Sequence, residues 1–327
     1  MSDARVTRVE YRFGRFGATP RARLLALSLR MTVRPVGARL PLSPVSVRSM
    51  GVLAEVGASV LRPPRGTWIE PVRLPGFTAE WVRARRVPIS ARAVLYLHGG
   101  GFLLGSARTH RGLVARLSAA ADAPVLAINY RHPPQVPLSA TVDDCVTAYR
   151  WLLDQGFASQ RIVIAGDSAG GNLVFATVLK ARELGLAPPA GLVGLSSCFD
   201  LTLSGETIRA NARCDPFLPA SALIRFVQFL CDGHDAADPG LSPLYADLTG
   251  LPPVLLQVGS TEVLRSDSER MAYRLTQAGV GCVLQVWERQ VHVFQGFAPF
   301  TREALAAIRE VGLFIGQVTA GATMGDS

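Results

Sequence analysis

Short apolar runs alternate with longer segments of helical periodicity over most of the chain after about residue 90. An apolar run rich in Val, Ile and Leu is typical of a strand that is covered on both faces. Strands are predicted at Ala93–Leu97, Val125–Ile128, Ile162–Ile164, Gly191–Leu195, Val254–Val258 and Cys282–Trp287. Helices are predicted at Thr109–Ala121, Ser139–Leu153, Asn172–Leu184, Ser266–Ala278 and Thr301–Ile315. This alternation predicts an α/β fold with a mostly parallel sheet flanked by helices.

The pattern differs at both sides of this region. Trp68–Leu74 and Ala79–Val87 are predicted to be strands joined by a Pro75-Gly76 turn. Residues 1–60 read as irregular and helical pieces broken by prolines, and between Phe199 and Leu251 loops and helical fragments replace the alternation. Arg21–Val33 carries leucines among arginines, which predicts an amphipathic helix lying on the rest of the protein or on a bilayer.

The composition is that of a globular protein. The chain has 327 residues, of which 49% are hydrophobic and 18% charged, so a large core is expected and disorder is not. The five cysteines are scattered without C-x-x-C spacing, which predicts free thiols in a reducing compartment. The apolar run Leu24–Leu29 is short and closed by Arg30, so no secretory signal is evident and a cytoplasmic location is expected.

Positive charge is concentrated near the N-terminus. Residues 1–90 hold 16 Arg against 5 acidic residues, while the remainder holds 18 basic against 20 acidic residues. One interpretation is a solvated basic segment, and the other is attraction to an anionic membrane or an acidic partner. Because no nucleic-acid-binding module accompanies the arginines, nucleic acid is not expected as a partner.

The candidate chemistry centres on Gly166-Asp167-Ser168-Ala169-Gly170, between a predicted strand and a predicted helix. A G-x-S-x-G sequence in this setting is typical of a nucleophile elbow, in which a strained turn exposes the serine hydroxyl. The two glycines are needed because a Cβ at either position would collide with the neighbouring strand and helix. Ser168 is therefore the candidate nucleophile.

A serine hydroxyl needs a base within hydrogen-bond reach and an acid that orients the base. Of the five histidines, His292 follows the last predicted strand, where a loop would lie over the elbow. Glu262 follows the strand ending at Val258 and is the preferred acid on the chain order serine, acid, histidine. Asp267 and Asp200 remain alternatives. Asp267 falls in the first turn of a helix for which Ser266 and Glu269 predict a capping box.

A glycine run supplies candidate donors for a developing oxyanion. His98-Gly99-Gly100-Gly101 follows the predicted strand Ala93–Leu97. Main-chain N–H groups of Gly100 and Gly101, together with that of Ala169 after the serine, are the expected donors.

These motifs resemble those of the hormone-sensitive lipase-like family of α/β-hydrolase esterases. The likeness covers about residues 93–297 and includes His98-Gly-Gly-Gly-Phe, Asn129-Tyr-Arg, Gly166-Asp-Ser-Ala-Gly-Gly-Asn, Asp200-Leu-Thr, Asp238 to Asp247 and Leu251-Pro-Pro-Val. The resemblance implies an α/β-hydrolase core at 61–199 and 251–318, helical cap segments at 1–60 and 200–250, and a flexible tail at 319–327. Two departures are Glu262, where the family usually has Asp, and His132-Pro-Pro-Gln135, where it usually has Leu-Ala-Pro-Glu.

The predicted function is that of a serine hydrolase acting on small carboxylic esters of short to medium acyl chain through an acyl-enzyme. No cofactor and no metal is expected. Amidase, lactonase and thioesterase activities use the same triad and remain alternatives, as does a non-catalytic ligand-binding protein on this fold. The sequence leaves the oligomeric state and membrane contact open, although related esterases often form homodimers through the last strand.

Overall fold

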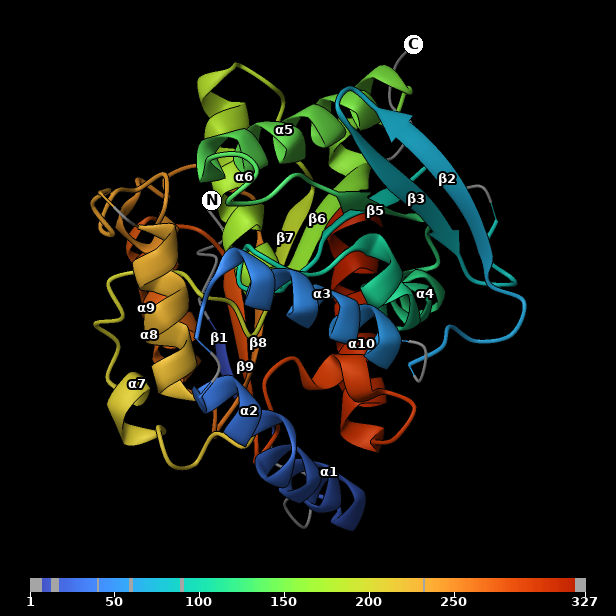
Figure 1. The fold of residues 1–327 in the computed structure, drawn as a ribbon. Coiled ribbons are helices and arrows are strands. Elements are labelled where there is room, and N and C mark those ends of the chain that lie inside the picture. The colour runs from blue at the N-terminus through green and yellow to red at the C-terminus, as the bar shows by residue number, and fades with distance from the viewer. Residues whose placement is uncertain are drawn as a thin grey trace.

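A twisted β-sheet forms the centre of the molecule. The computed structural model describes residues 8–12, 18–39, 41–58, 61–88, 91–231 and 233–320. In these residues nine strands lie in the order β1-β9-β8-β7-β6-β4-β5-β3-β2 (Figure 1). The parallel central strands are β4 (Ala93–Leu97), β5 (Val125–Asn129), β6 (Ile162–Asp167), β7 (Gly191–Leu195), β8 (Val254–Gly259) and β9 (Cys282–Trp287). The predicted mostly parallel α/β sheet is confirmed.

The antiparallel part of the sheet is a hairpin of β2 (Trp68–Leu74) and β3 (Phe77–Arg83), which pairs with β5. The turn is Pro75-Gly76, as predicted, and Gly76 has a φ of +89°, which glycine adopts without steric cost. β3 is shorter than the predicted Ala79–Val87, because the Val87 N–H donates to Ala84 in a turn.

β1 (Arg8–Arg12) is a strand where irregular or helical structure was expected. It pairs in parallel with β9, with Arg8 beside Val283 and Arg12 beside Trp287. The five-residue segment carries no hydrophobic run of its own, and its partner lies some 275 residues later in the chain. A pairing of this kind comes from tertiary context, which local sequence does not report.

Helices cover both faces of the sheet. α4 (Ala107–Ala121) and α10 (Arg302–Ala320) bury side chains on one face, and α5 (Leu138–Asp154), α6 (Ala169–Glu183) and α9 (Arg265–Gln277) on the other. Successive β4 residues face opposite sides of the sheet. Leu95 packs in the core that contains α5, α6 and α9, and Val94 packs in the core that contains α4 and α10. Continuous burial of both faces explains why the strand sequences are apolar throughout.

Further helices lie at the end of the sheet where the carboxyl ends of β4 and β6 meet (Figure 1). They are α1 (Pro20–Met31), α2 (Val33–Arg39), α3 (Pro44–Ala58), α7 (Thr207–Ala210) and α8 (Ala220–Leu230). The two segments that contain them touch one another, since Arg225 donates to Gly37 O at 2.6 Å and Arg34 to Asp215 O at 2.9 Å.

The boundaries of the five predicted helices differ from expectation by up to five residues, and the differences at α9 and α10 have a structural reason or consequence. α9 begins at Arg265 with Leu264 at its N-cap and no side-chain cap, so the predicted Ser266–Glu269 capping box is wrong. The Ser266 hydroxyl instead lies 2.8 Å from that of Thr207. α10 continues to Ala320, past the predicted Ile315 and two residues into the expected tail; the remaining tail, 321–327, lies outside the described residues. No helix in the described part of the chain is long and apolar enough to cross a membrane.

Candidate active site

Ser168 stands at the corner between β6 and α6. Its φ of +53° and ψ of −119° place it in a strained conformation that non-glycine residues seldom adopt. The helix begins directly after it at Ala169, earlier than the predicted Asn172. The strained turn lifts the hydroxyl off the sheet and directs the N-terminal end of α6 at the space beside it.

The glycines of the elbow are required by close packing. A Cβ on Gly170 would overlap the carbonyl oxygen of Leu97 on β4, and one on Gly166 would overlap that of Gly170. A Cβ on Gly171 would overlap the Ser197 hydroxyl. The elbow therefore lies directly against the neighbouring strand, as the sequence predicts.

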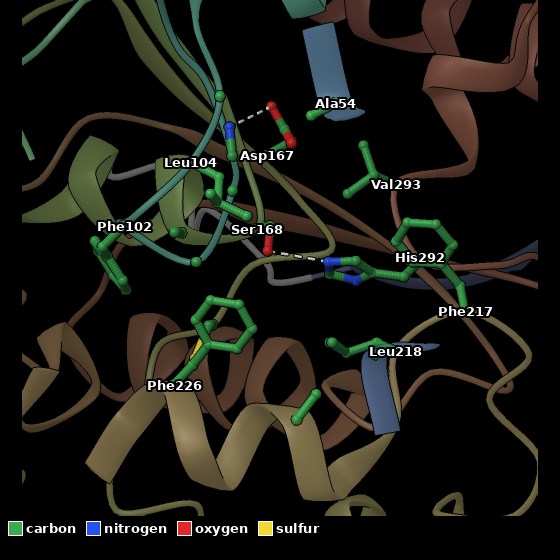
Figure 2. A pocket seen from close by; sticks show the side chains of 18 of the residues that line it. Ala54, Phe102, Leu104, Asp167, Ser168, Phe217, Leu218, Phe226, His292 and Val293 are labelled. Carbon is green, nitrogen blue, oxygen red and sulfur yellow. Dashed lines mark hydrogen bonds between the residues drawn. The ribbon is translucent and has the colours of Figure 1, made fainter. Parts of the chain in front are cut away.

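His292 bridges Ser168 and Glu262. Its Nε2 lies 3.0 Å from Ser168 Oγ, and its Nδ1 lies 2.8 Å from Glu262 Oε2 (Figure 2 shows the first contact). A carboxylate only accepts, so Nδ1 carries the proton and Nε2 is free to accept from the serine. The three side chains come from the loops or turns after β6, β8 and β9, and all three meet at the carboxyl end of the sheet.

Burial and charge set the protonation of this pair. Burial alone would lower the pKa of His292, but the hydrogen bond and negative charge of Glu262, helped by Asp215, raise it above its ordinary value. Burial raises the pKa of Glu262, and His292 opposes that rise. Glu262 Oε1 also accepts from Ser196 Oγ at 2.8 Å and from the Gly259 N–H, which fixes the carboxylate in place.

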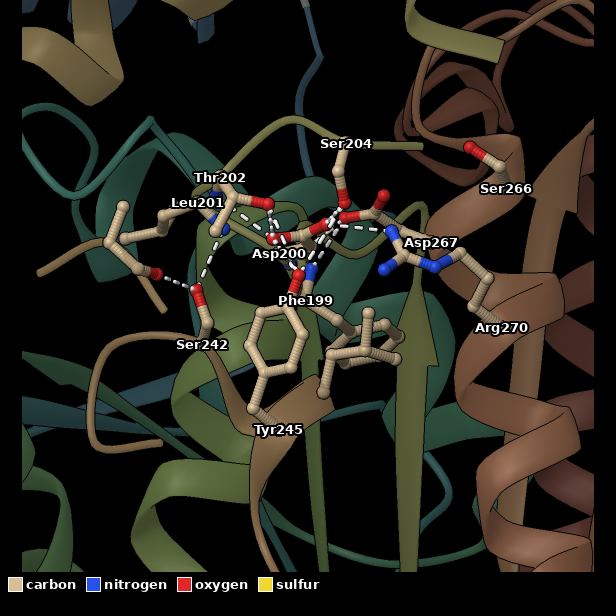
Figure 3. A network of polar contacts seen from close by, with 12 residues as sticks. Phe199, Asp200, Leu201, Thr202, Ser204, Ser242, Tyr245, Ser266, Asp267 and Arg270 are labelled. Carbon is tan, nitrogen blue, oxygen red and sulfur yellow. Dashed lines mark hydrogen bonds and ion pairs between the residues drawn. The ribbon is translucent and has the colours of Figure 1, made fainter. Parts of the chain in front are cut away.

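The alternative acids lie in a separate network (Figure 3). Asp267 accepts from the N–H groups of Phe199 and Asp200 at 2.8 and 3.1 Å, and Asp200 accepts from Arg270 at 2.7 Å. Burial, together with the charge of Asp200, raises the pKa of Asp267 to about 7. Asp267 therefore holds the chain after β7 and does more than complement a helix dipole, and in the described residues neither aspartate hydrogen-bonds to His292.

The glycine run lies beside the serine in the same pocket. Gly99, Gly100, Gly101 and Ala169 line the pocket with Ser168 and His292. Gly100 and Gly101 have φ angles of +127° and +63°, a conformation that strains other residues. The loop can adopt this shape only because these positions are glycine.

Asp167 holds this loop from below. Its Oδ1 accepts from Tyr96 OH at 2.7 Å and from the Gly99 N–H at 3.0 Å, and it lies 3.4 Å from His110 Nε2. Burial alone would raise the pKa of Asp167, but the positive charge and hydrogen bond of His110 lower it. Burial alone would lower the pKa of His110, and Asp167 raises it. A buried aspartate and a half-buried histidine thus face one another under the glycine run, and each favours the charged form of the other.

His98 anchors the loop as a neutral side chain. Burial, with the charge of His110 next, lowers the pKa of His98 to about 3. Its Nδ1 lies 2.8 Å from Gly99 O, which can only accept, so the Nδ1–H donates to it. The ring stacks on Tyr130 at 4.1 Å, and the Tyr130 hydroxyl donates to His98 O at 2.7 Å.

Two residues beside His292 were not predicted from the sequence. Asp215 accepts from the N–H groups of Phe217 and Leu218 at 2.9 Å and from that of Val263, next to Glu262, at 3.0 Å. This holds the ring of Phe217 against His292, with the ring centres 6.0 Å apart. The Asp215-Pro216 pair signals a turn, but only the fold brings that turn to the histidine.

An apolar pocket opens beside the serine. Its volume is about 420 Å³, and it is lined by residues of α2, α3, the glycine run and α8. Aliphatic and aromatic side chains predominate, among them Leu104, Leu201, Leu218, Phe226, Val227 and Leu230. Among the described residues no group of three His, Cys, Asp or Glu is placed to bind a metal ion. The arrangement suits attack of Ser168 on a carbonyl that carries an apolar substituent.

Comparisons with known proteins agree with the geometry. A family described by its alpha/beta hydrolase fold matches residues 94–296. An acetyl-hydrolase of Streptomyces hygroscopicus is 40% identical over 74% of this chain and 80% of its own. The carboxylesterase/phospholipase LipF of Mycobacterium tuberculosis is 34% identical over 94% of this chain and 84% of its own. The crystal structure of an esterase from the bacterial hormone-sensitive lipase family superposes with a TM-score of 0.86 at 36% identity, covering 92% of this chain and 99% of that one.

The fold and the site thus define an α/β hydrolase. Within that class the chain belongs to the hormone-sensitive lipase-like family of esterases, which confirms the resemblance seen in the sequence.

Proposed function

We propose that Ser168, His292 and Glu262 are the catalytic residues of this carboxylesterase-type serine hydrolase. The observation that carries the proposal is the continuous chain of two hydrogen bonds from Ser168 Oγ through His292 to Glu262 Oε2, 3.0 and 2.8 Å long. His292 Nε2 accepts the serine proton as Oγ attacks the ester carbonyl, and it returns that proton to the departing alcohol. Water then enters the acyl-enzyme, and the same steps release the acid and restore Ser168.

The negative charge of each tetrahedral intermediate requires fixed donors. We assign this role to the main-chain N–H groups of Gly100, Gly101 and Ala169, which border the pocket beside Ser168. Main-chain donors held by a rigid loop lose no reorganisation energy when the charge develops. The contact of Asp167 with His110 and the neutral His98 hold that loop in its strained shape.

The substrate is a small carboxylic ester with a short to medium acyl chain. The apolar lining and the volume of about 420 Å³ support an aliphatic acyl group, because no charged side chain other than those beside Ser168 lines the described pocket. The relatives named acetyl-hydrolase and carboxylesterase support the same class. A cytoplasmic location and a homodimer stay predictions from the sequence.

Replacement of the serine tests this proposal. Ser168→Ala is expected to lower kcat on p-nitrophenyl butyrate by about 10⁶-fold, the order lost when the nucleophile of a comparable triad is removed. Ser139→Ala, which alters an exposed serine at the start of α5, is the matched control and retains wild-type rates. A fluorophosphonate probe labels the wild type and the control but not Ser168→Ala. Full activity of Ser168→Ala on the ester contradicts the assignment.

The amidase, lactonase and thioesterase alternatives are separated by substrate. Four substrates of similar size offer Ser168 different leaving groups. They are a butyrate ester, the matched anilide, the matched thioester and a lactone. The ester is expected to show the highest kcat/KM, because the relatives are named acetyl-hydrolase and carboxylesterase. A higher kcat/KM for any of the other three reassigns the activity while leaving the catalytic residues unchanged.

A further inference from the structure

Exposed aliphatic side chains gather on the three N-terminal helices. Of the sixteen large hydrophobic side chains that are exposed in the described residues, nine lie on α1, α2 and α3. On α1 they form a stripe at helical spacing: Leu24, Leu27 and Met31 are 67%, 53% and 71% exposed. On α3, Val45, Val52 and Leu53 are 75%, 59% and 67% exposed. We call the exposed sides of these three helices the cap face.

The inner sides of the same helices already pack on the protein. Leu29 of α1 and Val47 of α3 are buried, and Met50 of α3 lines the pocket. α1 and α3 are therefore apolar on two sides, and the described residues cover only one of them, whereas α2 has no buried residue and adds Val33 and Val36 to the exposed side. An exposed apolar surface of this kind marks an interaction site.

The cap face is also strongly basic. Residues 18–58 contain six arginines and a single acidic residue, Glu55. Arg30 and Arg34 donate to main-chain carbonyls of residues 212–215, which leaves their charges uncompensated. Among the described residues Glu55 pairs with Arg108 of α4, and none of the six arginines takes part in an ion pair. Exposed aliphatic residues interleaved with arginines are typical of a helix that lies in a lipid headgroup layer.

Two residues of this face also line the pocket. Val33 of α2 lines the pocket and is nevertheless 44% exposed, and Ala54 of α3 likewise both lines the pocket and is exposed. Figure 2 shows Ala54 on the opposite side of the pocket from Leu218 and Phe226. The rim of the acyl pocket and the cap face thus share residues of the same two helices.

We propose that the cap face binds an anionic lipid surface, and that the esters hydrolysed at Ser168 include acyl esters dissolved in that surface. The second half of this proposal rests on the proposed function, whereas the first half does not. Aliphatic side chains enter the acyl region, and arginines bind the lipid phosphates. A second copy of this chain fits the face less well, because a symmetric contact would bring arginine-rich helices opposite one another.

Sedimentation with lipid vesicles tests the binding. The Ser168→Ala protein is used so that the lipid is not consumed, with vesicles of phosphatidylglycerol or of phosphatidylcholine, at low and at high salt. Binding is expected to phosphatidylglycerol at low salt, and it weakens with salt and with the neutral lipid. Arg21→Gln/Arg23→Gln/Arg48→Gln is expected to weaken it by about 100-fold at low salt. Leu24→Ser/Leu27→Ser/Val52→Ser is expected to weaken it at least about tenfold.

The matched control removes exposed apolar side chains elsewhere. Tyr273→Ser/Leu313→Ser alters α9 and α10, where these side chains are 66% and 61% exposed, and it retains wild-type binding. The proposal is overturned if the protein does not sediment with phosphatidylglycerol at low salt, if it binds phosphatidylcholine equally, or if the aliphatic variant binds as well as the control. A dimer that forms without lipid and is lost in the aliphatic variant also overturns it and assigns the face to a second copy.

Two activity measurements separate this proposal from the esterase assignment. With Ser168 restored, the aliphatic variant is expected to hydrolyse soluble p-nitrophenyl acetate at the wild-type rate but a vesicle-embedded acyl ester more slowly. Equal rates on the embedded ester contradict the substrate half. If the wild type hydrolyses no ester at all, the proposed function is contradicted, whereas the binding result is unaffected.

Discussion

At the scale of single residues, the position of each charge explains the chemistry of the site. Glu262 occupies a place where related esterases usually have the shorter aspartate. Its carboxylate reaches His292 while its other oxygen accepts from Ser196 and the Gly259 N–H. A buried carboxylate with three donors is held in one orientation, so the extra methylene does not loosen the histidine.

Glu262→Gln tests both orientation and charge. The base must be neutral to accept a proton, and the pKa of His292 is raised by Glu262, so in the wild type kcat/KM falls with decreasing pH through a value above about 6.5. In the variant burial acts without that carboxylate charge, which lowers the pKa of His292 and moves the fall to lower pH. The expected loss in kcat is about 10⁴-fold.

A pH–rate profile of kcat/KM measures both effects, and Asp267→Asn serves as the comparison. That variant leaves the acid limb where it is in the wild type, since Asp267 contacts the main chain of Phe199 and Asp200. If Asp267→Asn caused the larger loss and the shift of the limb, the orienting acid would have to be reassigned.

Asp167 is expected to act as a positioning residue. Asp167→Asn removes the negative charge that binds His110 while keeping a side chain of the same shape, so the glycine run is less firmly held. A small displacement of oxyanion donors costs about 10²-fold in kcat, with KM little changed. Steady-state kinetics on a soluble ester measure this, with Asp247→Asn, an exposed carboxylate, as control. A rise in KM at unchanged kcat would argue instead for a role in substrate binding.

At the scale of elements, close helix contacts depend on particular glycines. α10 crosses α4 at Gly312, where an added Cβ would overlap the Ala120 carbonyl. One turn later on the same helix, the position of a Cβ on Gly316 has nothing within 4 Å. The two glycines thus have opposite roles on the same helix, since one permits the crossing and the other only weakens the helix.

Alanine substitution separates these roles. Gly312→Ala is expected to destabilise the protein by about 1–3 kcal/mol through overpacking. Gly316→Ala, the matched control, is expected to stabilise it by about 0.5–1 kcal/mol, because alanine costs less backbone entropy in a helix. Urea unfolding measures both. Equal changes in the two variants would show that the crossing tolerates a methyl group.

Sequence patterns predicted the elements that their own residues specify. β4, β6 and β8 are buried on both faces, so their apolar runs identified them, and Pro75-Gly76 identified the hairpin. β1 was missed because its pairing is with a strand at the other end of the chain. At the site, Ser168 was indicated by the G-x-S-x-G motif, His292 by its place after the last strand, and Glu262 by the chain order serine, acid, histidine. The role of Asp215 depends on a loop that only the folded chain brings beside His292.

At the scale of the whole molecule, the sheet ends in two different edges. The β2–β3 hairpin forms one, and β1 covers the outer side of β9 at the other. Pairing of two copies through the last strand, the arrangement expected by resemblance, would require β1 to be displaced. β1 therefore protects the main-chain groups of β9 and is itself the edge strand on this side, five residues long.

Removal of residues 1–17 tests this protection. The shortened protein exposes the main-chain donors and acceptors of β9 and is expected to self-associate with increasing concentration. Analytical ultracentrifugation compares it with the full chain over the same range. If both sediment identically at every concentration, β1 has no protective role.

The contact of Phe226 with Gly101 has a consequence for engineering. Atoms of that ring on α8 lie 2.9 and 3.0 Å from the point where a Gly101 Cβ would sit. A chimera that takes α8 from another esterase would therefore alter the support of the glycine run as well as the shape of the acyl pocket. We therefore expect an exchange of α8 to change acyl selectivity and turnover rate together.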